Sequence, residues 1–234
     1  YTIKQKSKFQ PTAVKMKSGK DKIKSGKEIV LDRYVMGKSG NAFSFLVNYQ
    51  RCLAYDDASN TILGTYRADP ATYPDALGSG TTMSHFSTDG GETWTSQITC
   101  NPDPNDHALR YPSGIIYNPD GYTNTDDLFT VVAGPSHQGG IWDFTYFGSA
   151  QLNNTNHNEY YHAWSELDGN DWARSSMTTN NGMVFHYGQD YTTVGTQGTN
   201  QTMKQYIGTT DDPVEGFDWE VIEVTPNWLT DPSD

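Results

Sequence analysis

Acidic side chains are the residues of this sequence that are best placed to do chemistry in pairs. Two carboxylates that flank a glycosidic bond can hydrolyse it by general acid and base catalysis, and adjacent acids occur at Asp56-Asp57, Asp126-Asp127 and Asp211-Asp212. All three pairs fall in turn-rich sequence, where solvated acids are the ordinary occupants. Asp120, Asp126 and Asp127 also gather oxygen ligands of the kind that calcium prefers, although without EF-hand spacing. We therefore expect no cofactor, with calcium at these three residues as the alternative.

Other catalytic patterns are missing from the sequence. The six histidines show no HExxH or comparable metal-ligand spacing. No Gly-x-Ser-x-Gly elbow occurs, so a serine hydrolase is not expected. Cys52 and Cys100 stand in no CxxC pattern, and a single disulfide between them stays open.

Composition and charge limit the class of protein. The chain has 234 residues, 35% of them hydrophobic and 13% aromatic, and no apolar run approaches the roughly 18 to 20 residues that span a bilayer. Nine lysines and one acid give residues 1–27 a charge of +8, which leaves −20 for residues 28–234 out of the total of −12. The acidic part would repel nucleic acid and anionic membranes. Residues 1–27 are predicted to be a lysine-rich leader, edge strand or linker, able to dock onto the acidic body of another copy or another surface protein.

The elements that must position these residues are short β-strands. Beyond residue 28 no convincing 3.6-residue period occurs, and β-branched and aromatic segments alternate with Asn, Asp, Gly and Pro clusters. Strands are predicted over residues 42–47, 51–55, 61–67, 81–87, 114–117, 128–133, 145–149, 182–187, 204–209 and 219–224. Many short strands with turn-rich joints predict an all-β sandwich, barrel or propeller.

An internal repeat favours the propeller. Leu53-Ala54-Tyr55-Asp56 aligns with residues 115–118 and, more loosely, with residues 183–186. Each is followed by a second strand, by a third that ends near a small or hydroxyl residue, and by a tryptophan: Trp94, Trp164 and Trp219. Three repeats of strand, strand, strand and Trp-bearing strand predict propeller blades with long loops.

One motif carries a family resemblance. The segment Ser87-Thr88-Asp89-Gly90-Gly91-Glu92-Thr93-Trp94 resembles the Asp-box, S-x-D-x-G-x-T-W, of BNR or sialidase-type β-propellers. Ser87 and Asp89 can bond the backbone of the turn, Gly91 can supply a positive φ, and Trp94 can pack below. The resemblance implies a structural turn, containing Thr93 as well, between the third and fourth strands of a blade.

A degenerate second copy of the motif occurs at repeat distance. Its residues are Thr209, Asp211, Gly216 and Trp219, with an insertion inside the turn. The expected fold over residues 28–234 is thus a propeller of four-stranded blades. Because closed propellers have about 4 to 8 blades, some three long blades predict an incomplete one.

A closer resemblance points to export. Residues 109–121, 132–135 and 147–152 resemble the BNR-like propellers of large surface proteins that Bacteroidetes export by type IX secretion. This resemblance implies an extracellular or cell-surface location and a chain that is one part of a larger protein.

The Asp-box resemblance is to a family that includes the sialidases. These enzymes hold a substrate carboxylate with three arginines, because the planar guanidinium fork suits a carboxylate. Arg110-Tyr111-Pro112 resembles the Arg-Ile-Pro signature of these enzymes, but it follows the full Asp-box, whereas the signature of the enzymes precedes it. Arg67 is the alternative candidate for holding a carboxylate. Salt bridges are the plainer explanation for both. We therefore expect a noncatalytic module of an adhesive or structural surface assembly that binds protein or glycan partners. The alternative is a sialidase-like glycoside hydrolase with part of its machinery outside this chain.

Overall fold

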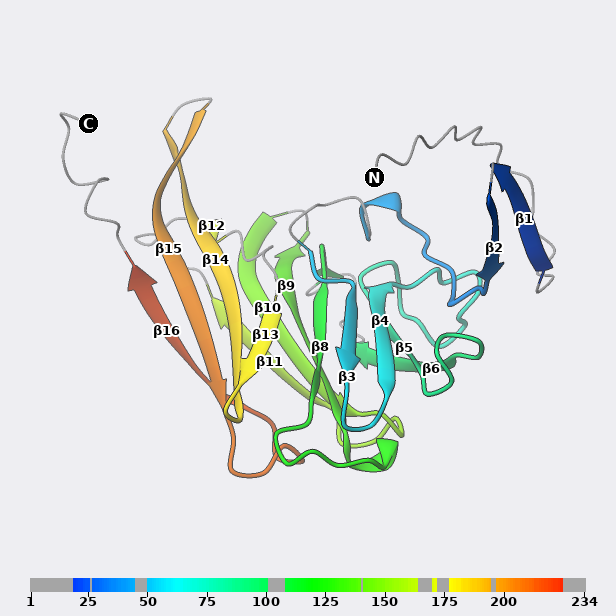
Figure 1. Ribbon diagram of the computed structural model, residues 1–234. Helices are drawn as coiled ribbons and strands as arrows, with labels where there is room; N and C mark the ends of the chain where they lie inside the picture. The colour runs from blue at the N-terminus through cyan, green and yellow to red at the C-terminus, as the bar shows by residue number, and fades with distance from the viewer. Residues whose placement is uncertain are drawn as a thin grey trace. The chain divides into compact units, whose positions relative to one another are not determined.

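The computed structural model describes residues 19–25, 27–44, 50–100, 108–139, 141–163, 170–171, 177–194 and 197–224 (Figure 1). The chain divides into two compact units, Tyr1–Val35 and Met36–Asp234. In the first, β1 (Gly19–Ser25) pairs antiparallel with β2 (Lys27–Arg33). The register places Lys20 opposite Asp32 and Lys24 opposite Glu28. The division at Val35 lies beyond the sequence boundary at residue 27 because β2 pairs with the lysine-rich strand.

The second unit is all-β, as predicted. It holds three antiparallel sheets, none closed into a barrel. Its described residues include two 3-10 segments, η1 (Ala42–Ser44) and η2 (Thr125–Asp127), and no α-helix. The strand predicted over residues 42–47 is wrong where it is described, because η1 occupies its first part. No helix in the described residues is long and apolar enough to cross a membrane.

The first sheet is a four-stranded meander. Its order is β3 (Leu53–Asp56), β4 (Thr61–Arg67), β5 (Thr82–Ser87) and β6 (Thr95–Cys100). The bounds of β4 match the predicted strand. Because neighbouring strands alternate in direction, β4 ends beside the start of β5, where Arg67 stands opposite Thr82.

The second sheet repeats this plan with a divided first strand. β7 (Ala108–Leu109) and β8 (Ser113–Tyr117) both pair with β9 (Phe129–Gln138), which continues to β10 (Ile141–Gln151) and β11 (Asn158–Ala163). Between β7 and β8 the chain turns at Arg110 and at Tyr111, whose φ of 47° is positive. A bulky residue rarely takes that conformation.

The third sheet corrects the predicted repeat. It contains β12 (Asn170–Asp171), β13 (Met177–Asn180), β14 (Met183–Val194), β15 (Gln197–Thr209) and β16 (Asp218–Val224). Residues 183–186 are not a first strand, because β14 is one long second strand that also includes residues 191–194. Asn181 and Gly182 make the preceding hairpin turn, with φ of 50° and 74°. An Asn-Gly pair between two strands is a strong local signal for such a hairpin.

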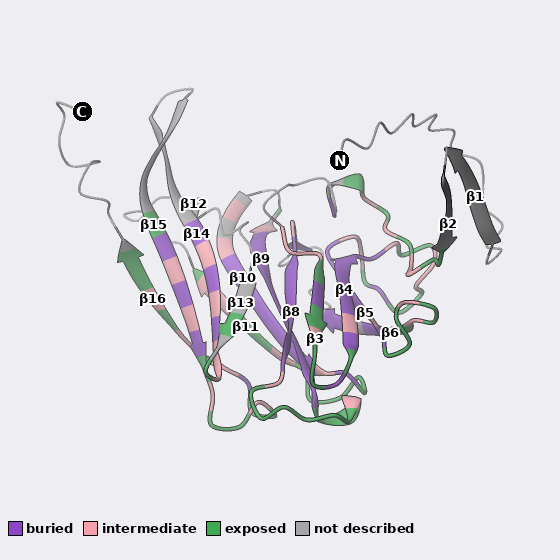
Figure 2. Cartoon of the chain, viewed as in Figure 1, coloured by how far each residue is buried: buried purple, intermediate pink, exposed green. Residues whose placement is uncertain are grey.

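The central strand β8 joins the three sheets. Ile116 packs with Ala54 and Leu63 of the first sheet, whereas Ile115 and Tyr117, on the opposite face of β8, pack with residues of the third. All of β8 is buried, as its purple colour in Figure 2 shows. Such two-sided burial explains its continuous apolar sequence.

Hydrogen bonds fix the sheets against each other. The Gly114 amide donates to Arg51 O at 3.0 Å, and Asn118 Nδ2 donates to Asp56 Oδ2 at 2.9 Å. A bond of 2.9 Å from the Tyr117 hydroxyl to Gly182 O links β8 to the third sheet. These bonds hold the strand ends of different sheets in a defined arrangement.

Candidate functional site

The turn between β5 and β6 is held by its own side chains. Asp89 accepts hydrogen bonds from the Thr93 amide at 2.9 Å, the Thr93 hydroxyl at 2.6 Å and the Glu92 amide at 3.0 Å. Ser87 donates to Asp89 at 2.7 Å and accepts from the Gly91 amide at 2.8 Å. Because these bonds favour the charged carboxylate, led by the one from the Thr93 hydroxyl, they hold the pKa of Asp89 well below its usual range.

The two remaining features of this turn follow its local sequence. Gly91 has a φ of 93°, the conformation predicted for it, and Trp94 Nε1 donates to Gly91 O at 2.9 Å. The turn joins the third and fourth strands of the first sheet. Its side chains bond to the turn itself, which indicates a structural role.

The corresponding turn of the third sheet is built differently. Gly216 again has a positive φ, 100°, and Trp219 stacks on Phe147 of the second sheet at 3.8 Å between ring centroids. Two side chains accept from amides of this turn: Asp212 from the Val214 amide at 2.9 Å and Thr210 from the Asp212 amide at 3.1 Å. The degenerate motif predicts Asp211 for such a place. Trp164 lies outside the described residues.

Arg67 is a buried cation. Its side chain, at the end of β4, is 3% exposed. Nε donates to Ser79 O at 2.6 Å and Nη2 to Ser79 Oγ at 3.0 Å, which uses two of the five N–H donors of a guanidinium. Burial, with repulsion from Arg110, lowers the pKa of Arg67 to about 10. The group is therefore charged at neutral pH.

Arg110 brings a second guanidinium to the same loop. It follows β7, is half-buried, and donates from Nη1 to Leu109 O at 3.1 Å. A Cβ on Gly80 would lie 3.3 Å from Arg110 Nη1, so this guanidinium rests against the residue next to Ser79. Burial lowers the pKa of Arg110 as well. Within the described residues neither Arg67 nor Arg110 has a carboxylate partner.

Polar and aromatic groups complete the arginine site, which we define as Arg67, Arg110, Thr82, His137 and Trp142. Thr82 Oγ1 and His137 Nδ1 are buried and accept or donate no hydrogen bond among the described residues. Trp142 meets His137 edge to face, with ring centroids 5.1 Å apart. Burial, followed by repulsion from Arg110 and Arg67, lowers the pKa of His137, which is therefore neutral at pH 7.

The arrangement of the arginine site suits an anion. An uncompensated buried charge is costly, and unpartnered buried polar atoms mark places where a partner is expected. Arginine forks bind carboxylates through paired, charge-assisted hydrogen bonds. A carboxylate-sized anion between the guanidinium groups would relieve the repulsion between them.

Sequence reasoning found only part of this site. Arg67 and Arg110 were alternatives for one role, and the structure brings both to one loop. His137, Thr82 and Ser79 were missed, because no local pattern distinguishes them from other polar strand residues. The turn at Arg110 and Tyr111 packs closely on Gly134, where a Cβ would lie 2.5 Å from Arg110 O.

The predicted carboxylate and calcium residues lie elsewhere. Asp126 and Asp127 belong to η2, where Asn124 Oδ1 accepts from the Asp126 amide at 3.3 Å and Asn124 Nδ2 donates to Asp127 at 3.2 Å. Asp120 lines a cavity of about 470 Å³ together with Asp127 and Asp211. Among the residues placed by the structure, no cluster of three or more His, Cys, Asp or Glu side chains is arranged to hold a metal ion. Calcium there stays a prediction.

Cys52 is a free thiol, so it does not form the disulfide with Cys100 that the sequence left open. Its Sγ donates to Ser44 O at 3.3 Å, and burial raises the pKa of the thiol to about 11. A thiol with a raised pKa is a poor nucleophile at neutral pH.

No protein-family model matches this chain, and no curated protein matches it. Its function is therefore inferred from side-chain geometry.

Proposed function

We propose that this chain is part of a noncatalytic β-propeller module that binds a carboxylate-bearing partner at the arginine site. The observation that carries the proposal is the burial of Arg67 beside Arg110 with no carboxylate partner among the described residues. Two of the five N–H donors of Arg67 and one of those of Arg110 are used internally. Within the described part of the chain the other N–H donors of the two guanidinium groups make no hydrogen bond.

Thermal stability in the presence of small carboxylates tests this proposal. A ligand that binds only the folded state raises the unfolding temperature. We expect acetate, glucuronate and N-acetylneuraminate to raise it above the value in chloride at equal ionic strength. Arg67→Gln and Arg110→Gln should abolish the shift, and Arg33→Gln, an exposed arginine of the other unit, should retain it. Equal shifts in all variants would contradict the proposal.

The propeller architecture is supported by the repetition of one plan. Each of the three sheets of the second unit is an antiparallel meander whose second, third and fourth positions are single strands. The first strands β3, β8 and β13 lie beside one another along the row of sheets, and glycines with positive φ occur in the third-to-fourth turn of the first and third sheets. The test is an experimental structure of the native protein. A further four-stranded sheet packed on β3 or β14 would support the proposal, and a sandwich partner would contradict it.

A surface assembly is the setting we propose, with the lysine-rich segment as its contact. The charge of +8 on residues 1–27 beside −20 on the rest favours association that weakens with salt. Light scattering should therefore show self-association in low salt that is lost in high salt. Replacing Lys20, Lys22 and Lys24 by glutamate should also remove it, and association that salt leaves unchanged would contradict the role.

A sialidase-like glycoside hydrolase is the second candidate, favoured by the meeting of the two arginines at one loop. It predicts turnover of a fluorogenic sialoside that Arg110→Ala abolishes. Binding of N-acetylneuraminate without turnover would leave the noncatalytic module as the better proposal.

A further inference from the structure

A second cavity lies between the outer strands of the second sheet and the segment that leads into β16. Its volume is about 130 Å³, and a water needs about 10 to 15 Å³ of such space. The cavity therefore has room for a compact molecule of monosaccharide size. It is lined by Val131 of β9, by residues of β10 and β11, and by Glu215, Gly216, Phe217 and Trp219. It shares no residue with the arginine site, whose Trp142 lies at the start of β10.

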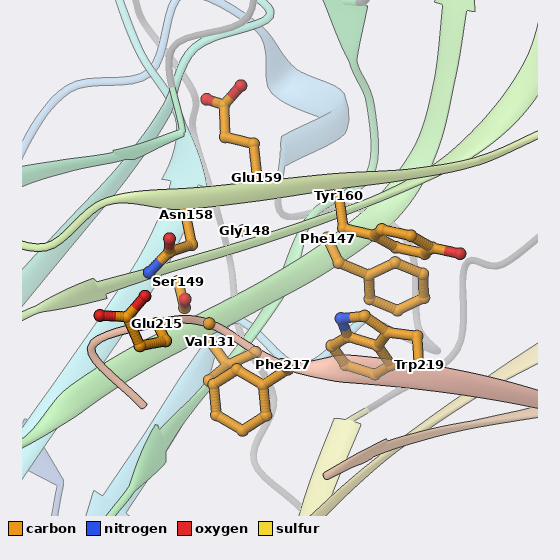
Figure 3. A pocket seen from close by; sticks show the side chains of 11 residues that line it. Val131, Phe147, Gly148, Ser149, Asn158, Glu159, Tyr160, Glu215, Phe217 and Trp219 are labelled. Atoms are coloured by element: carbon orange, nitrogen blue, oxygen red, sulfur yellow. The ribbon is translucent and has the colours of Figure 1, made fainter. Parts of the chain in front are cut away.

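One wall of this cavity is aromatic. Phe147 lies between Trp219, at 3.8 Å between ring centroids, and Tyr160, at 6.2 Å. Figure 3 shows these three rings gathered on one side of the cavity, with Phe217 nearby. Because Phe147 and Trp219 stack on each other, the wall offers apolar surface and few free ring faces. Tyr160 is 39% exposed on the edge strand β11 and stands at the mouth.

The other wall carries hydrogen-bond acceptors. Asn158 Nδ2 donates to Val214 O at 2.9 Å, which fixes the 212–216 turn to β11 and leaves the amide oxygen for a ligand. Figure 3 shows Glu215 on the same side as Asn158, and Glu215 is exposed, with no ion pair within the described part of the chain. Gly216 keeps this wall close to β11, since its φ is 100° and a Cβ would lie 3.2 Å from Asn158 Cβ.

The chemistry of the lining selects the ligand. The described lining residues include no Lys, Arg or His, so an anion has no partner there. A cation would need free aromatic faces, and two of the four rings of the lining, Phe147 and Trp219, are stacked on each other. An uncharged polyol offers apolar C–H surface to one wall and several hydroxyl donors to the acceptors of the other.

We propose that this cavity is a binding site for a neutral monosaccharide unit of a glycan, with Glu215 and Asn158 accepting its hydroxyls and Tyr160 covering it. The site uses none of the residues of the arginine site. It gives the module a second, uncharged recognition point, and it stands independently of the carboxylate proposal.

Saturation-transfer NMR with four probes tests the sugar site: methyl α-D-mannoside, methyl β-D-galactoside, methyl β-D-glucoside and methyl N-acetyl-β-D-glucosaminide. We expect saturation of at least one. Glu215→Gln should weaken its binding by about tenfold, since a hydrogen bond to a charged acceptor is lost, and Tyr160→Ala should weaken it as well. The matched control Glu220→Gln, an exposed acid of β16 outside the cavity, should leave binding unchanged.

Other outcomes would overturn the sugar site. They are no saturation of any of the four probes, equal affinity in Glu215→Gln and the wild type, or saturation of tetramethylammonium but of no sugar. Arg67→Gln separates the two sites, because it should abolish carboxylate binding and leave sugar binding intact. Sugar binding that disappears in Arg67→Gln would assign the sugar to the arginine site and also overturn the proposal. Because Glu215 is exposed, its substitution leaves the folded core untouched.

Discussion

Arg67 and Arg110 rest against consecutive residues of one loop, Arg67 bonded to Ser79 and Arg110 beside Gly80. The two side chains come from different sheets, and their charges repel each other. Arg67 is almost fully buried. The pair therefore costs stability in the free protein, and a bound anion would offset that cost.

The first prediction concerns stability without ligand. Arg67→Met removes a buried charge but keeps an apolar side chain of similar length, and a buried charge without an opposite partner is costly. We expect a gain of no more than about 1 kcal/mol, because the loss of the two bonds to Ser79 offsets part of the relief. Urea unfolding measures it, and the same variant should not respond to acetate. A loss of stability would show that the Ser79 bonds outweigh the buried charge.

The second prediction is a pH dependence of anion binding. Burial, followed by repulsion from Arg110 and Arg67, lowers the pKa of His137, and an anion bound between the arginines should raise that pKa again. Binding then takes up a proton, and affinity should rise as the pH falls towards the pKa of His137 in the complex. Calorimetry in two buffers of different ionisation enthalpy measures the uptake. His137→Gln should remove it, and uptake that survives the substitution would point to another group.

The third prediction concerns acid stability. His85 is buried, with Nε2 2.5 Å from the Tyr66 hydroxyl and Nδ1 3.0 Å from Ser96 Oγ, and burial lowers its pKa from 6.5 to about 4. The unfolded chain therefore binds a proton between these values where the folded chain does not. Stability present above pH 6.5 should fall by up to about 3 kcal/mol as the pH drops to 4.

Urea midpoints at pH 7 and pH 4.5 check this loss. Carboxylates titrate in the same range, so the comparison is with His85→Gln, which should lose less stability on acidification than the wild type. Equal losses in the two proteins would contradict the assignment to His85.

The fourth prediction concerns the turn between β5 and β6. The two carboxylate oxygens of Asp89 accept hydrogen bonds from Thr93 and from the Glu92 amide. Asp89→Asn leaves only one acceptor oxygen, so the unfolding temperature should fall. Glu92→Gln changes a neighbouring exposed acid and should have little effect. The pKa of Asp89 is depressed, so the stabilising effect of its carboxylate should be present at neutral pH. On acidification this effect should be lost only at pH values below the ordinary range of aspartate pKa values. Thermal unfolding of both variants at pH 7 and pH 3 measures this, and equal midpoints for Asp89→Asn and Glu92→Gln would refute it.

Local features of this protein could be predicted from sequence because their interactions are local. Alternating and β-branched residues determined most strands, as at Thr61–Arg67. The positive φ of Gly91 was predictable because the bonds that require it join Ser87, Asp89 and Thr93 of the same turn. Residues 183–186 form a strand, as predicted, but the second strand of the sheet instead of the first, because Asn181 and Gly182 make a hairpin turn before it.

Tertiary structure decided the candidate sites. Sequence offered Arg67 and Arg110 as alternatives, because nothing local shows that β4 of one sheet and the turn after β7 of the next reach the same loop. The contact between Trp219 and Phe147 also has no local sequence signal, because the two rings stack only when the second and third sheets pack together. Charge repulsion, burial and cavity shape depend on distances between sheets, whereas residue types along one strand specify only the strand and its turns.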